Sequence, residues 1–183
     1  MAAGPAPHSH YHESPGTEWL CEILTHTITH VYSELGTMPT ERQCVAALNH
    51  ELVSLGPEIV QRVSLESPVP VLFQTSSGQT HLLGTDRIDL LLETIDEHVP
   101  GGVRRTIIEV KTNTTNGVYL SKALTQARRY STLLQTSGVE IHTICGIVYP
   151  KEGTVCKPIF KVIDVIPEER AGDDVTTAVE ASV

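Results

Sequence analysis

Two short apolar segments carry the residues whose types and spacing could do chemistry. Asp89 lies in the first, residues 87–92, and Glu109 lies in the second, residues 107–111, two positions before Lys111. Because side chains alternate between the faces of a strand, Glu109 and Lys111 should point to the same face. Two carboxylates on neighbouring strands, beside an ammonium group, can hold a divalent cation and a water. This pattern predicts hydrolysis of a phosphodiester bond.

The spacing of the two acids is compatible with a metal site. Asp89 and Glu109 are 20 residues apart, which is enough for one loop to return the chain onto an adjacent antiparallel strand. Hard cations take oxygen ligands and keep several waters. We therefore expect Asp89, Glu109 and the backbone carbonyl of Val110 to bind Mg²⁺ or Mn²⁺. Lys111 would position the attacking water or help to deprotonate it.

A helix expected from Tyr119 to about Gln135 offers a further polar group. Gln126 and Tyr130 are four residues apart, so they share one face of that helix. Gln126 could then reach the same site and hold a water or a phosphate oxygen.

The charge of the chain is acidic overall but uneven. The formal net charge is −9, from 13 Lys and Arg against 22 Asp and Glu, which argues against non-specific coating of nucleic acid. Residues 167–183 are acidic, whereas residues 103–129 hold six basic residues against Glu109 alone. Charge alone favours an ordinary solvated surface. Beside a metal site, the expected nucleic-acid contacts are Arg87, Arg104, Arg105, Lys122, Arg128, Arg129 and Tyr130.

Composition indicates one domain with an aliphatic core. The chain has 183 residues, of which 40% are hydrophobic and only 4% aromatic. No stretch has the length and apolarity of a membrane span or the pattern of a secretory leader. Four cysteines without a C-x-x-C pair suggest reduced thiols. We expect a soluble intracellular protein, in the cytoplasm, the nucleus or a virus particle.

Periodicity and turn residues predict a mixed α+β sheet flanked by helices, in which an antiparallel meander is followed by a crossover helix. Residues 1–16 should be a disordered histidine-containing tail, residues 17–166 the domain and residues 167–183 a flexible acidic tail. The expected helices are Thr17–Leu35, Glu41–Leu55 and Tyr119–Gln135. The expected strands are Ile59–Leu65, Val69–Phe73, Ile88–Glu93, Val103–Lys111, Val139–Tyr149 and Ile159–Ile166.

Glu51 lies on or beside the buried side of the second expected helix. A carboxylate in that position needs a partner. An arginine such as Arg87 would make a structural salt bridge, whereas the alternative is that Glu51 faces the metal site. His26 and His30 lie one turn apart with no evident acidic partner and should face solvent. The tail histidines, His8, His10 and His12, offer at most a weak metal site.

Several segments together resemble one known family. They are Glu22–Leu24, His30–Gly36, Glu41, Ala47–Leu48, Glu51–Leu52, Gly84–Asp89, Ile108–Lys111, Gln126, Tyr130–Leu133 and Gly146–Val148. Across about residues 18–165 the chain resembles the PD-(D/E)xK nuclease superfamily, and within it the small GxxExxY-type proteins of bacteria and large DNA viruses. The resemblance implies a restriction-endonuclease-like core, which is a helix, a three-stranded meander, a helix and a further strand.

The same resemblance implies roles for individual residues. Asp89 and Glu109 would be metal ligands, and Lys111 would serve the nucleophilic water. Glu51 would support the metal or orient a water, and Gln126 would complete the site.

The sequence also departs from the pattern of that family. Met38 and Cys44 stand where glycine and tyrosine flank the family's glutamate, so only Glu41 of the name-giving segment is retained. An inserted loop, His98–Gly102, lengthens the meander.

Two functions follow as hypotheses. The first is a Mg²⁺- or Mn²⁺-dependent endo- or exonuclease acting on nucleic acid, with DNA the expected substrate and no membrane partner. The second is a catalytically silent nuclease-fold protein that serves in binding or assembly, for example in a virion. It would form a homodimer or a larger complex, with an exposed strand edge at Val139–Tyr149 or Ile159–Ile166 as the contact.

Overall fold

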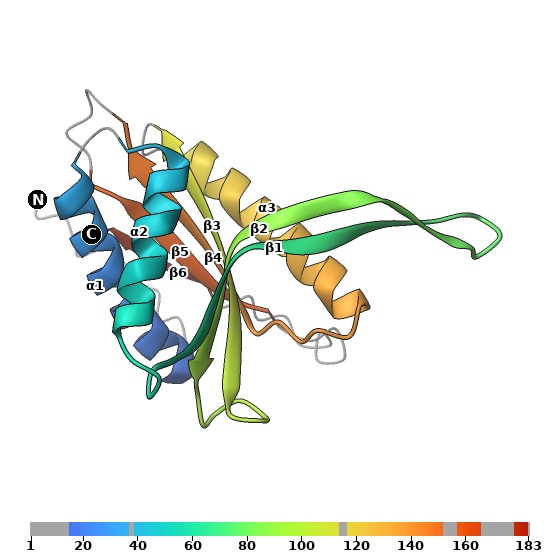
Figure 1. The fold of residues 1–183 in the computed structure, drawn as a ribbon, viewed down its shortest axis with the longest axis horizontal. Coiled ribbons are helices and arrows are strands. Elements are labelled where there is room, and N and C mark those ends of the chain that lie inside the picture. The colour runs from blue at the N-terminus through green and yellow to red at the C-terminus, as the bar shows by residue number, and fades with distance from the viewer. Residues whose placement is uncertain (1–14, 37–38, 114–116, 152–156, 166–177, 183) are drawn as a thin grey trace, which may run out of the picture.

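The structure, a computed structural model, describes residues 15–36, 39–113, 117–151, 157–165 and 178–182. It shows one sheet with helices packed on both faces (Figure 1). The helices are α1 (Pro15–Leu35), α2 (Glu41–Ser54) and α3 (Gly117–Thr136). The strands are β1 (Val60–Gln74), β2 (Thr80–Ile95), β3 (Val103–Asn113), β4 (Thr143–Pro150), β5 (Ile159–Asp164) and β6 (Ala178–Ser182).

The six strands lie in the sheet in sequence order. β1, β2 and β3 form an antiparallel meander, β3 pairs with β4 in parallel, and β4, β5 and β6 are antiparallel. A parallel pair requires a crossover, and α3 supplies it. The predicted mixed α+β sheet is therefore confirmed. The exposed strand edge that was predicted on β4 or β5 is wrong, because both strands have a neighbour on each side.

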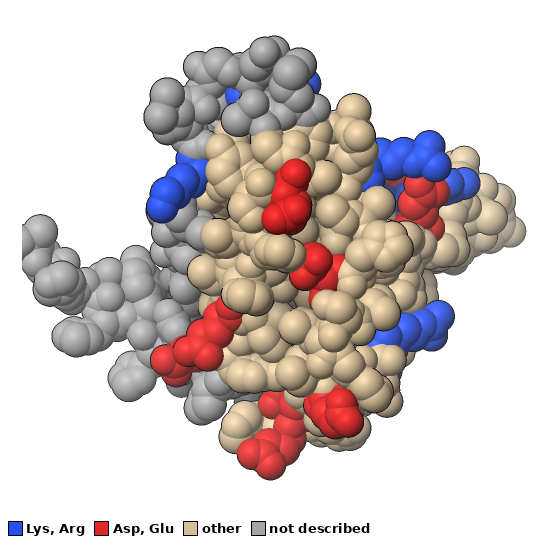
Figure 2. All heavy atoms as spheres, turned by 60° about the vertical axis from the view of Figure 1, so that its left-hand side comes forward, with Lys and Arg blue, Asp and Glu red and all other residues tan. Residues whose placement is uncertain are grey.

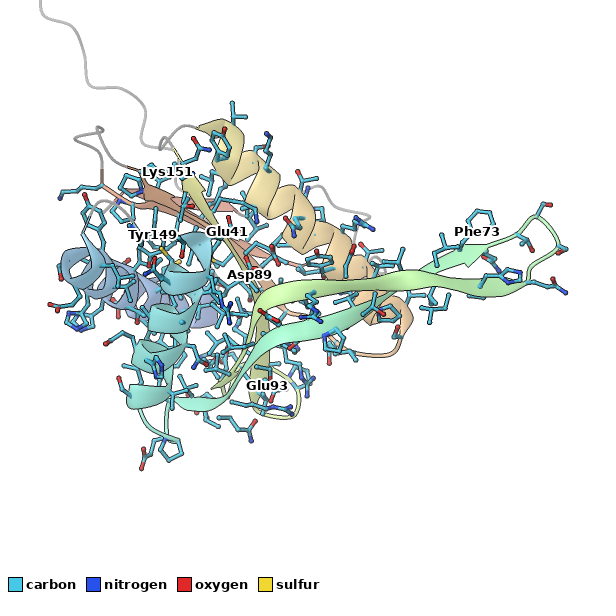
Figure 3. All side chains as sticks on the ribbon, turned by 45° about the horizontal axis from the view of Figure 1, so that its top comes forward. Glu41, Phe73, Asp89, Glu93, Tyr149 and Lys151 are labelled. Carbon is cyan, nitrogen blue, oxygen red and sulfur yellow. The ribbon has the colours of Figure 1, made fainter. Side chains whose placement is uncertain are left out.

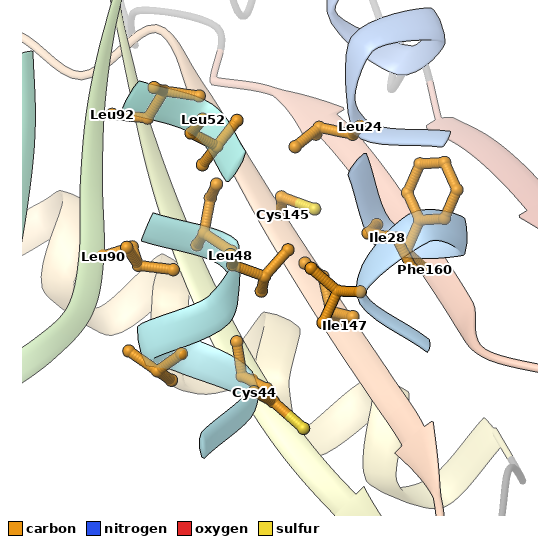
Figure 4. Close-up of a cluster of buried hydrophobic side chains, with 14 of the residues drawn as sticks. Leu24, Ile28, Cys44, Leu48, Leu52, Leu90, Leu92, Cys145, Ile147 and Phe160 are labelled. Carbon is orange, nitrogen blue, oxygen red and sulfur yellow. The ribbon is translucent and has the colours of Figure 1, made fainter. Parts of the chain in front are cut away.

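The larger core lies between the sheet and the helices α1 and α2. Leucine and isoleucine side chains of both helices, spaced by one helical turn, meet alternate residues of β2, β3 and β4 (Figure 4). β4 is buried along its whole length, as expected for a central strand covered on both faces. Among the described cysteines, Cys21, Cys44 and Cys145 form no disulfide, and Cys145 is fully buried.

The start of α2 is set by a capping box. The side chain of Thr40 accepts a hydrogen bond from the backbone of Gln43, and the side chain of Gln43 accepts one from the backbone of Thr40. These two bonds satisfy amide groups that a helix otherwise leaves unpaired at its first turn. The cap therefore determines that Glu41 is the first residue of the helix.

Helix α3 covers the opposite face of the sheet, where Ala127 and Tyr130 pack against Ile107. Gly146 on β4 permits the close approach of this helix. A Cβ atom at Gly146 would lie 3.0 Å from Cγ of Leu124, which is closer than normal packing allows. Glycine at this position therefore helps to set the distance between α3 and the sheet.

The β1–β2 hairpin differs most from expectation. The sequence predicted two separate strands, whereas β1 is a single strand that pairs with β2 along its length, with register shifts at two places. β2 pairs with β3 only between Leu90 and Ile95. Past that point the hairpin leaves the body of the sheet and extends as a two-stranded ribbon (Figure 1). We call residues 70–85 of this ribbon the arm.

The structure describes only short segments of the predicted tails. Residues 178–182 form β6 and pair with β5, so the prediction of a flexible tail is wrong for them. Residues 166–177, the N-terminal segment 1–14 with its histidines, and Cys156 lie outside the described residues. Within the described part of the chain, no helix is long and apolar enough to cross a membrane.

Candidate functional site

The candidate site lies where the β2–β3 ladder ends. The last residue pair of that ladder is Leu90 opposite Ile108. Beyond it, the backbone N–H of Val110 donates to Oδ2 of Asp89 at 2.8 Å, and the backbone N–H of Asp89 donates to Oε1 of Glu109 at 3.3 Å. Carboxylates thus replace carbonyls as acceptors for two strand amides, which holds both acids at the end of the ladder. Figure 3 shows Asp89 near the point where the arm leaves the sheet.

Glu109 is the most unusual group of the site. Its side chain is fully buried, and its second oxygen, Oε2, has no hydrogen-bond partner in the described part of the chain. Burial, followed by the negative charge of Asp89, raises the pKa of Glu109 to about 8. A buried carboxyl oxygen that faces a second acid and lacks a donor is a place where a cation is favourable.

Lys111 is the nearest cation. Its Nζ lies 3.8 Å from Oε2 of Glu109, which confirms that the two side chains share a face of β3. The same Nζ lies 3.4 Å from Oε1 of Glu41. The ammonium group therefore bridges an acid on the sheet and an acid at the start of α2.

Sequence reasoning did not assign Glu41 to the site. One signal in the sequence could have identified Glu41. It is the one residue that matches the name-giving segment of the family that the chain resembles. The cap at Thr40 then places it at the first turn of α2, within reach of Lys111.

Glu51 was expected at the site, and the structure places it elsewhere. It lies ten residues after Glu41, which is about 15 Å along the helix axis. Its Oε1 lies 3.5 Å from Nε2 of His30, and both side chains are partly exposed. The expected salt bridge between Glu51 and Arg87 is wrong, because Arg87 pairs instead with Glu66 at 2.7 Å. The described ion pair of Glu51 is with His30 and not with a residue of the candidate site.

Gln126 and Tyr130 share a face of α3, as predicted. Nε2 of Gln126 donates to the hydroxyl of Tyr130 at 2.9 Å, and neither Asp89 nor Glu109 is among its described partners. Tyr130 is buried, and its pKa is raised by that burial and by the negative charge of Glu109. The described contact of Gln126 is therefore the Tyr130 hydroxyl.

Arg104 was expected to contact nucleic acid, and that prediction is wrong. Its side chain is only 6% exposed and donates to Asp96 at 2.6 Å and to Asp164 at 3.1 Å. Burial alone would raise the pKa of Asp96, but the hydrogen bonds from Arg104 and from the His98 amide, together with the nearby positive charge, outweigh it and the pKa is lowered. Arg104 is a structural cation that joins three segments of the chain.

The other predicted contacts fall into two groups. Arg105, Arg87 and Arg129 are in ion pairs with Glu93, Glu66 and Asp86 respectively. Lys122 and Arg128 are exposed on α3, where the Lys122 ammonium lies over the ring of Tyr119. By contrast, the face that carries α1 and α2 shows separate acidic side chains, with basic ones only at its margin (Figure 2).

The donor set suits a hard cation with few protein ligands. Among the described residues, no group of three or more His, Cys, Asp or Glu is arranged to hold a metal ion. Mg²⁺ is commonly bound by only one or two carboxylates together with water and substrate phosphate. Asp89 and Glu109, with the unpartnered Oε2 atom, match that requirement.

The sequence was also compared with known proteins. No family model matches it, and no curated protein matches it. The chemistry of Asp89, Glu109 and Lys111 therefore carries the functional interpretation.

Proposed function

We propose that this protein is a Mg²⁺- or Mn²⁺-dependent nuclease with a restriction-endonuclease-like core, which hydrolyses phosphodiester bonds in DNA. The observation that carries the proposal is the buried carboxyl group of Glu109, whose Oε1 accepts from the amide of Asp89 and whose Oε2 has no hydrogen bond and lies 3.8 Å from Nζ of Lys111. Leaving a buried carboxyl oxygen without a hydrogen bond costs roughly 1–3 kcal/mol or more. A site that keeps such an atom is suited to a cation.

The arrangement of elements supports the same function. A helix, a three-stranded antiparallel meander, a crossover helix and a parallel fourth strand follow one another in this order. The PD-(D/E)xK resemblance implies the same order, with the two acids on the second and third strands of the meander. Asp89 and Glu109 occupy β2 and β3.

The side chains have separable roles in the proposed reaction. Asp89, Glu109 and the carbonyl of Val110 would hold the cation, which on binding lowers the pKa of water and polarises a phosphoryl oxygen. Lys111 positions the attacking water and offsets negative charge on the phosphate. Glu41 orients the Lys111 ammonium through their 3.4 Å ion pair.

Plasmid cleavage by the purified protein tests the proposal, with Mg²⁺, Mn²⁺ and EDTA compared side by side. Cleavage should require metal and fall by about 10²-fold or more in Lys111→Ala, because a positioned proton-transfer group contributes about that factor. Lys157→Ala is the matched control, since Lys157 is exposed on the segment before β5. Its activity should equal that of the wild type.

A well-folded wild-type protein that cuts neither duplex DNA, single-stranded DNA nor RNA with either metal would contradict the nuclease. The binding or assembly function would then replace it. Equal cleavage by Lys111→Ala and Lys157→Ala would contradict the proposed centre even if the protein is a nuclease.

A further inference from the structure

The arm is the most exposed apolar element among the described residues. Leu72, Phe73, Leu82 and Leu83 are 38%, 52%, 65% and 66% exposed, and Phe73 lies far out along the ribbon (Figure 3). Leu72 lies directly opposite Leu82, so the pair shares one face of the ribbon. Leu83 is the extra residue at a register shift and has no cross-strand partner. A two-stranded ribbon in water is only marginally stable, so these side chains favour a covering partner.

The two edges of the arm are not equivalent. β1 carries Pro68 and Pro70. Because proline inside a sheet occurs where its missing N–H faces away from the ladder, the outer edge of β1 is blunted against further pairing. β2 has no proline, every residue from Thr80 to Thr85 is exposed, and no described strand pairs with the second edge of this segment. An incoming strand is therefore directed to the β2 edge.

The charge of the arm decides which partner fits that edge. Residues 70–85 contain no Lys, Arg, Asp or Glu. The arm thus has no cation to neutralise a phosphate backbone or an anionic lipid surface. It also lacks the charged side chains that commonly prevent one sheet edge from pairing with another. Two identical neutral edges can meet without repulsion between like charges.

We propose that the arm is a self-association surface. The β2 edge of one copy, residues 80–85, pairs antiparallel with the same edge of a second copy about a twofold axis. The two arms form a four-stranded ribbon in which Leu82 and Leu83 of one copy pack beside those of the other. This inference does not depend on the proposed nuclease activity.

Light scattering coupled to size-exclusion chromatography of the full chain tests the inference. The wild type should have the mass of two copies, against 19.9 kDa for one chain. The double variant L82K/L83K should have the mass of one copy, because it places like charges opposite each other in the paired edges. The control Val53→Lys alters a side chain that is 56% exposed on α2, and it should remain a dimer.

Hydrogen exchange locates the contact. Amides of residues 80–85 should exchange more slowly at high than at low protein concentration, and L82K/L83K should abolish that difference. Three results would overturn the proposal. They are a monomeric wild type at every concentration, a dimer that survives L82K/L83K with unchanged exchange, and a monomer that binds DNA or neutral lipid vesicles through Leu82 and Leu83.

Discussion

The backbone amide of Asp89 donates to the Glu109 carboxylate across the end of the β2–β3 ladder, at 3.3 Å. One oxygen of Glu109 is thereby used to hold the neighbouring strand, and the other is left without a hydrogen bond. Since Asp89 in turn accepts from the amide of Val110, each acid is held by the backbone of the opposite strand. The site is therefore preorganised by the sheet itself, and its ionisation should be linked to folding.

The stability of the metal-free protein should fall as pH rises. The pKa of Glu109 is about 8 in the folded state, against an ordinary value of 4.5. Between these values the folded chain keeps a proton that the unfolded chain has released, so this carboxyl favours folding below pH 4.5 and loses that contribution progressively up to about pH 8. Urea unfolding in EDTA at several pH values measures it. Glu109→Gln should show a smaller decline, and identical declines in both proteins would contradict the burial of an ionisable group here.

Metal binding should release a proton. A cation on Glu109 favours the ionised carboxylate, so at pH 6 it must displace the proton that burial retains. Mg²⁺ should therefore raise the melting temperature more at pH 8.5 than at pH 6. Calorimetry in buffers of different ionisation enthalpy should show proton release at pH 6 and little at pH 8.5. Metal binding without pH dependence would place the cation away from Glu109.

Two glutamates on α2 should behave differently. Glu41→Gln removes the charge that orients Lys111, and cleavage should fall by about tenfold, which corresponds to about 1.4 kcal/mol. Glu51→Gln alters a partly exposed pair with His30, an interaction that contributes about 0–1 kcal/mol, and it should leave cleavage unchanged. Cleavage rates of the two variants, with matched circular dichroism, decide the question. The reverse order would restore Glu51 to the site.

Arg104 should matter for stability. Arg104→Ala leaves Asp96, whose side chain is 3% exposed, without its cation, and the free energy of unfolding should fall by about 3–5 kcal/mol. Arg105→Ala removes a partly exposed ion pair with Glu93 and should cost about 1 kcal/mol or less. Urea titrations of the two variants provide the comparison. Equal losses would argue against the buried network.

Local patterns predicted much of the fold. Periodicity and turn residues predicted α1 and α2 with ends within two residues of those observed. These features depend on neighbours within one turn of helix. β6 was missed because its segment lacks the apolar alternation of a half-buried strand and is paired only through its contact with β5.

Local spacing in the sequence was sufficient to predict which side chains share a face. Strand alternation put Glu109 beside Lys111, and helical spacing put Gln126 beside Tyr130. Only the tertiary structure decided which polar groups lose water and which distant groups meet. Arg104 could not be recognised as buried, because its partner Asp164 is 60 residues away in the sequence.

Which of Glu41 and Glu51 lies near Lys111 also depends on the tertiary structure. Both lie on α2, and their distance from Lys111 depends on how that helix crosses the sheet. Periodicity describes the face of an element, whereas desolvation and charge pairing depend on the element packed against it. The sequence therefore indicates which residues could take part in the chemistry. The fold determines which of them come together in one site.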